Sequence, residues 1–136
     1  MLFMLFMSER ETKLYFNVAG LITVISGLLT ILSPTSDTIF PFGLDTAILP
    51  ATNIYSSYWS YIVCLIGFLM IVASKVPALR VPVAIYSTIE KLYFIGMILL
   101  IMHQSEFLGT TYKYSLIIYS IICLYGSFYL GQYNRN

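Results

Sequence analysis

The stretch VPVAIYSTIEKLYFIGMILLIM, residues Val81–Met102, decides the fold of this chain. It is an apolar run about as long as the roughly 20 residues that an α-helix needs to cross a bilayer core of about 30 Å. Backbone groups in lipid must find hydrogen-bond partners within their own segment, so such a run forms a helix. Glu90 and Lys91 stand near its middle. The stretch therefore predicts a membrane-spanning helix that carries two charges in its central turns.

Further apolar runs of similar length accompany this one. The predicted membrane helices are residues 14–33, 54–73, 81–102 and 112–132. The short connections on both sides of the third helix make sequential helices antiparallel neighbours. Ser8 and Glu11 have the spacing of a capping box, which predicts that the first helix begins ahead of the membrane. The predicted fold is all-α: a polytopic integral membrane protein whose single domain, residues 1–136, is an antiparallel bundle of four transmembrane helices.

The composition agrees with a protein whose surface faces lipid. The chain is 59% hydrophobic and only 10% charged, whereas soluble domains carry about 25% charged residues. A net charge of +1 offers no concentrated basic face, which argues against nucleic-acid binding. Membrane lipid is the partner that the composition predicts.

The basic residues of the loops predict the orientation of the helices. One side of the membrane receives Arg10, Lys13, Lys75, Arg80 and Arg135, and the other receives Lys113. Loops rich in Lys and Arg stay in the cytoplasm. We therefore expect both termini to be cytoplasmic and the loop of residues 34–53 to lie outside.

The first helix carries small and weakly polar residues at helical spacing. Asn17, Gly20 and Gly27 mark this stripe, which Thr23 and Thr30 extend. Association of helices in lipid relies on close packing and interhelical hydrogen bonds. The stripe is interpreted as a helix-packing face.

Glu90 and Lys91 are the residues most in need of an explanation. Adjacent helical residues point about 100° apart and do not face each other as i,i+4 pairs do, so we expect them not to pair. The long stem of Lys91 can carry its ammonium group toward the headgroups. Glu90 must then find a partner, take up a proton, or face a polar interior. Counting residues from the helix ends places Thr23, Cys64, Ser120 and Cys123 at the depth of Glu90.

Several interpretations of this polar layer stay open. It is either a hydrogen-bonded network that fixes the helix register, a site for a lipid-like or quinone-like ligand, or a path for protons or ions. Thiol redox chemistry between Cys64 and Cys123 would require their Cα atoms within about 7 Å. No metal site is expected, because His103 and Glu106 alone do not make one. No set of catalytic residues stands out, and the chain is expected not to be an enzyme.

A longer pattern resembles a known family. The segments LYFNVAGLITVISGLLTILSP and YWSYIVCLIGFLMIVASKVPALRVPVAIYSTIEKL are similar to the DoxX-like group of small four-helix bacterial membrane proteins over residues 14–95. Lys91 matches a lysine of that group's third helix. The acidic residue expected early in the fourth helix is absent, and Ser115 or Ser120 stands nearby. The resemblance implies a bacterial cytoplasmic (inner) membrane. It also implies either an accessory or assembly role or kinship with subunits of quinone-linked oxidoreductases.

These observations lead to three functional hypotheses. The first is a non-catalytic accessory or assembly subunit of a larger membrane complex, with other membrane-protein subunits as partners. The second is a quinone-linked redox subunit that takes up protons through the Glu90 layer. The third is a small transporter. No cofactor is assigned; a quinone or a lipid is the ligand that the polar layer would suit.

Overall fold

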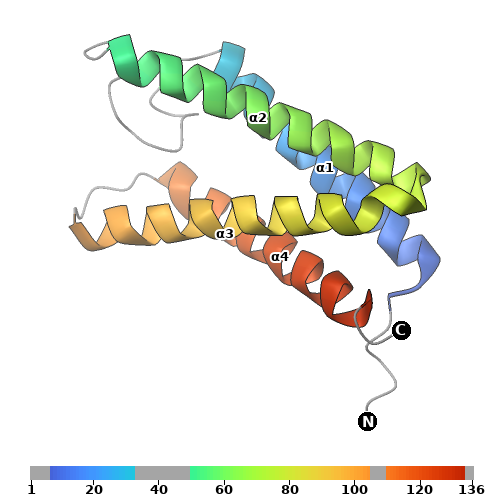
Figure 1. Ribbon diagram of the computed structural model, residues 1–136. Coiled ribbons are helices and arrows are strands. Elements are labelled where there is room, and N and C mark those ends of the chain that lie inside the picture. Colours follow the sequence, from blue (N-terminus) through green and yellow to red (C-terminus); the bar gives the residue numbers. More distant parts are fainter. Residues whose placement is uncertain (1–6, 33–49, 105–109, 134–136) are drawn as a thin grey trace.

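A computed structural model describes residues 7–32, 50–104 and 110–133, and these residues are almost entirely helical (Figure 1). The described segments form the α-helices α1 (Glu9–Leu32), α2 (Pro50–Lys75), α3 (Arg80–Gln104) and α4 (Thr110–Tyr133). A short 3-10 helix, η1 (Pro77–Leu79), joins α2 to α3. Each of α1 to α4 is long and apolar enough to cross a membrane. The prediction of an all-α chain with four helices of membrane-spanning length is therefore confirmed.

A capping box sets the start of α1. α1 begins at Glu9, ahead of the predicted residue 14. The capping box accounts for this start, because the Ser8 N–H donates to Glu11 Oε2 at 2.7 Å and the Glu11 N–H donates to Ser8 Oγ at 3.2 Å.

The second helix departs from the predicted loop boundary. α2 begins at Pro50, inside the segment 34–53 that was assigned to a loop. Proline suits the first turn of a helix because its missing N–H would have no partner there, which is why α2 can begin at Pro50 itself. The rest of that predicted loop, up to residue 49, lies outside the described residues.

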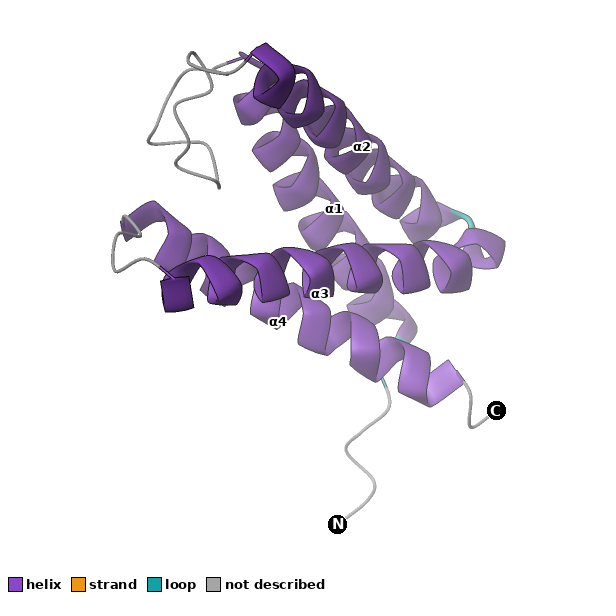
Figure 2. Ribbon diagram, turned by 60° about the vertical axis from the view of Figure 1, so that its left-hand side comes forward, coloured by secondary structure: helices purple, strands orange, loops and turns teal. Residues whose placement is uncertain are grey.

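The helices associate as two pairs. α1 packs along α2, and α3 packs along α4, whereas α2 touches α3 less and α1 scarcely touches α4. Figures 1 and 2 show the two pairs inclined to each other, with α3 crossing in front of α1 in the second view.

Close backbone contact holds α1 to α2. A methyl group added at Gly20 would lie 2.8 Å from the carbonyl oxygen of Gly67, and one at Gly27 would lie 2.9 Å from the carbonyl oxygen of Ser60. On the same face of α1, Asn17 Oδ1 accepts a hydrogen bond of 2.9 Å from the Ser74 hydroxyl. Thus Asn17, Gly20 and Gly27 all contact α2.

Hydrogen bonds of Arg80 and of Met7 bring one end of each of α1 to α4 together. The Arg80 Nη1 and Nη2 atoms donate to the two carboxylate oxygens of Glu9, each at 2.8 Å. Its Nε and Nη2 atoms also donate to the carbonyl oxygens of Ala73 and Ser74, each at 3.1 Å. Gln132 Oε1 accepts a 2.9 Å hydrogen bond from the N–H of Met7. The start of α1, the end of α2, the start of α3 and the end of α4 therefore lie together.

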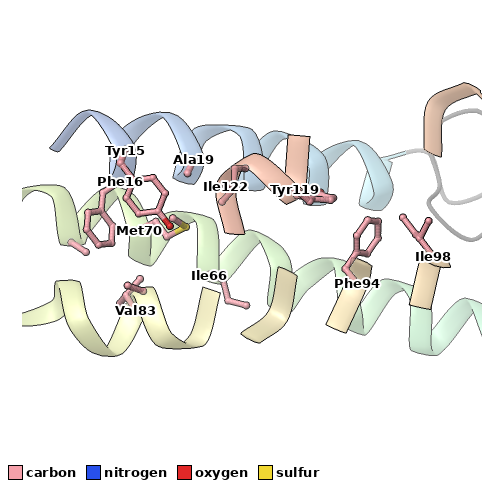
Figure 3. Packing of buried hydrophobic residues seen from close by; sticks show 12 residues of the cluster. Tyr15, Phe16, Ala19, Ile66, Met70, Val83, Phe94, Ile98, Tyr119 and Ile122 are labelled. Atoms are coloured by element: carbon pink, nitrogen blue, oxygen red, sulfur yellow. The ribbon is translucent and has the colours of Figure 1, made fainter. Parts of the chain in front are cut away.

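Large apolar and aromatic side chains fill the space between the pairs. Figure 3 shows Phe16, Met70 and Val83 toward one end of this core and Phe94, Ile98 and Tyr119 toward the other. Leu, Ile, Phe and Tyr side chains also cover much of the outer surface of α1 to α4. Apolar groups inside and outside alike are what a lipid environment permits.

Candidate functional site: a polar centre between the helices

Glu90 and Lys91 are both buried, and they pair with each other. Lys91 is 0% exposed and Glu90 is 8% exposed. The Lys91 ammonium group donates to Glu90 Oε2. The expectation that these neighbours would not pair was wrong, because it considered only the directions of the Cα–Cβ bonds. The flexible stem of lysine lets the charged ends of two adjacent side chains meet where water is excluded.

The burial of Lys91 also overturns the idea that its ammonium group reaches the headgroups. The Nζ atom lies 4.9 Å from the centre of the Tyr119 ring on α4, a cation–π distance. The Tyr119 ring is held edge-on by Phe94, with ring centres 4.7 Å apart. Its hydroxyl is hydrogen-bonded to Ser26 Oγ on α1 at 2.5 Å. Lys91 therefore finds both a carboxylate and an aromatic face inside the protein.

A small, partly open cavity of about 20 Å³ has Glu90 in its wall. Its walls come from each of α1 to α4: Ser26, Gly27, Trp59, Ser60, Val63, Glu90, Phe94 and Tyr119. Polar groups of different helices thus converge at one point, next to a buried ion pair. This polar centre, meaning Glu90, Lys91 and the residues around the cavity, is the candidate functional site.

Three of the four predicted companions of Glu90 lie about one helical turn away from the cavity, and Ser120 is the sequence neighbour of the cavity-lining Tyr119. We expect Thr23, Cys64 and Cys123 at the level of Glu90. In place of these residues, Gly27, Ser60 and Tyr119 line the cavity. Each of them is four residues from its predicted counterpart and lies farther from the Arg80 end. Counting depth assumes parallel helices that start at one level. The inclination between the two helix pairs shifts the level at which α3 meets the others (Figure 2).

The predicted residues have other partners. The Thr23 hydroxyl is fully buried and donates to the Ala19 carbonyl oxygen of its own helix at 2.7 Å. Cys64 Sγ lies 3.7 Å from the Val24 carbonyl oxygen, across the α1–α2 contact. Cys123 is buried on α4, and Ser120 is half-buried. Both cysteines are free thiols.

His103 lies exposed near the end of α3. Within the described ranges, no group of three His, Cys, Asp or Glu side chains could hold a metal ion. Glu106 falls outside those ranges.

Sequence reasoning missed Ser26, Ser60 and Tyr119. Ser60 sits in the aromatic-rich start of α2, which by composition is typical of a membrane interface, and Ser26 resembles any small residue of a packed helix. Spacing offers a weak signal for Ser26, which follows Thr23 by three residues and so lies on a neighbouring part of the same face. Arg80 was also missed as a buried residue, because as a loop charge it served only to predict orientation.

A second feature is a groove of about 810 Å³ between α1 and α4. Its lining is apolar apart from Glu11 and the hydroxyls of two tyrosines: Met7, Glu11, Leu14, Tyr15, Val18, Ala19, Ile22, Ile118, Ile121, Ile122, Leu124, Tyr125 and Phe128. The groove exists because α1 and α4 scarcely touch. The helical assembly is therefore open on the side between α1 and α4.

No protein-family model, curated protein or solved structure matches this chain. The resemblance to DoxX-like proteins therefore stays a prediction. Chemically, the polar centre combines a carboxyl group, an amine and several hydroxyls, which can hold helices in register or pass a proton over a short distance.

Proposed function

We propose that this protein is a non-catalytic accessory or assembly subunit of a larger membrane complex. In this proposal α1 to α4 cross a bacterial cytoplasmic membrane as an antiparallel bundle. Both termini are cytoplasmic and the loop before α2 lies outside. The groove between α1 and α4 is the observation that carries the proposal.

The dimensions of the groove suit a transmembrane helix of another subunit. Its α1 wall runs from Glu11 to Ile22, which is about 17 Å at 1.5 Å per residue. Helices in lipid associate by van der Waals packing and not by hydrophobicity. A long concave apolar face gives an additional helix more packing contacts than a convex lipid-facing surface would.

Site-specific photo-crosslinking in native membranes tests this proposal. The photoreactive residue replaces Val18 or Ile121 in the groove, which are 48% and 49% exposed. Leu92 and Leu99 on α3 are matched controls, because they are 54% and 52% exposed and lie away from the groove. We expect a defined protein adduct from the groove positions that the control positions do not give. Adducts with lipid alone, or equal adducts from all four positions, would contradict the proposal.

A second function is favoured by the Glu90 carboxyl group beside a cavity lined with hydroxyls. In a quinone-linked redox subunit, this carboxyl group would take up protons for the reaction. Glu90→Gln should then lower quinone-dependent activity in membranes, at a temperature where its helical content equals that of the wild type. Lys75→Gln, which alters an exposed charged group at the end of α2 and lines neither the cavity nor the groove, is the control. Unchanged activity in Glu90→Gln would remove this candidate.

A further inference from the structure

The cavity of the polar centre has the size of one water molecule. A cavity needs roughly 10–15 Å³ to hold a water, and this one has about 20 Å³. It is too small for an organic ligand, since ligand pockets have roughly 300–1,000 Å³. Size alone therefore limits the occupant to a single molecule about as small as water.

The walls offer the polar partners that a buried water requires. Internal waters make roughly two to four hydrogen bonds. The cavity presents the Glu90 carboxylate and the hydroxyl-bearing side chains of Ser26, Ser60 and Tyr119. A carboxylate only accepts hydrogen bonds, whereas hydroxyl groups both donate and accept. A water, which can do both, is complementary to this mixture.

The ion pair leaves the carboxylate able to bind further donors. A carboxylate has about four acceptor positions, and Lys91 donates to Oε2. A buried ion pair is stabilised when additional hydrogen bonds satisfy its remaining lone pairs. A water in the cavity can supply such a hydrogen bond to Glu90, which lines it.

The position of the cavity gives the water a structural role. The walls belong to both helix pairs, α1–α2 and α3–α4, which contact each other less than the helices within each pair do. A water bonded to Glu90 on α3 and to Ser60 on α2 would link the pairs beside the direct hydrogen bond between Ser26 and Tyr119.

We propose that the polar centre binds one structural water, which hydrogen-bonds to the Glu90 carboxylate and to hydroxyl groups of the α1–α2 pair and thereby joins the two helix pairs. This site is independent of the groove between α1 and α4 and does not rest on the accessory-subunit proposal.

Infrared difference spectroscopy of the full chain in phosphatidylcholine nanodiscs tests the proposal. Exchange of ordinary water for its oxygen-18 form shifts the O–H stretch of a bound water, and we expect one such band in the wild type. Val63→Ile adds a methylene group at the cavity wall and removes no polar partner, so the band should be lost. Val83→Ile is the matched control, because Val83 is also buried but does not line the cavity. It should retain the band.

A measurement that needs no variant complements this one. Nuclear Overhauser transfer from water to labelled Ser60 and Glu90 should appear in the wild-type chain and be absent at Ala73, which is buried at the Arg80 end. No isotope-sensitive band together with no transfer at Ser60 and Glu90 would overturn the proposal. A band that persists in a folded Val63→Ile variant would overturn it too.

Discussion

Glu90 and Lys91 are neighbours on α3, and their opposite charges stabilise each other inside an apolar assembly. On insertion scales, a Lys or Asp at the centre of a membrane helix costs about 2.5–3.5 kcal/mol. Glu90 and Lys91 reduce this penalty by pairing, and the Tyr119 ring adds a cation–π contact to Lys91. The pair is therefore tolerated as a unit, whereas either charge alone is not.

This coupling predicts strongly non-additive mutations. Lys91→Met should destabilise the protein by about 3–5 kcal/mol, because it leaves the buried Glu90 carboxylate without its counter-charge. Glu90→Gln should also destabilise it, and the double variant should recover most of the loss. Unfolding in mixed micelles, followed by circular dichroism, measures all three. Additive losses in the double variant would show that the pair does not act as a unit.

Arg80 carries a second prediction at the residue scale. Arg80→Gln removes the donors to the buried Ala73 and Ser74 carbonyl groups. Leaving buried carbonyl groups unsatisfied should lower the free energy of unfolding by about 1–3 kcal/mol. Lys13→Gln is the control, because Lys13 reaches the same Glu9 at 3.5 Å but is 54% exposed. Solvent screens such a pair, so we expect no measurable change. Equal stability of the two variants would refute this role of Arg80.

At the scale of the element, glycines set how closely α1 and α2 approach. A methyl group at Gly67 would lie 2.6 Å from the Val24 backbone nitrogen and 2.7 Å from the Gly20 carbonyl oxygen. These neighbours are backbone atoms, which cannot rotate away. The helices must therefore separate to admit any side chain at this position.

Glycine-to-alanine substitutions test this packing. Gly67→Ala should destabilise the protein by about 1–3 kcal/mol through overpacking. Gly96→Ala provides the matched control, because an added methyl group there meets nothing within 4 Å. Alanine is a better helix former than glycine by up to about 1 kcal/mol, so this control should be neutral or stabilising. Both are measured by unfolding in mixed micelles. A tolerated Gly67→Ala would mean that α1 and α2 are not in backbone contact.

At the scale of the whole molecule, the basic residues predict one orientation in the membrane. The Arg80 end of the assembly also holds Arg10, Lys13 and Lys75 at the adjoining helix ends, and Lys113 lies near the start of α4. Under the positive-inside rule, we expect the Arg80 end to face the cytoplasm. Fluorescent-protein fusions at either terminus should fluoresce in bacteria. Alkaline phosphatase inserted between α1 and α2 should be active. The reverse pattern would show the opposite orientation.

The helical elements could be predicted from sequence because their causes are local. Runs of apolar residues and the Ser8–Glu11 capping box act within a few residues of their own positions. The main error, the start of α2, arose because Pro50 suits both a loop and a first helical turn. Likewise, Gly20 and Gly27 could be proposed as packing residues from their spacing on one helix face.

The candidate site could be predicted only in part. The sequence determined that Glu90 and Lys91 would lie in the middle of a long apolar helix and would need compensation there. Only the tertiary structure decided that they compensate each other, that Tyr119 covers Lys91, and that Ser26 and Ser60 face the cavity. It also decided that α1 and α4 leave a groove between them. The physical reason is that hydropathy and capping are properties of one segment. The register between segments follows from the inclination of the two helix pairs, which depends on the side chains of all the helices packing together.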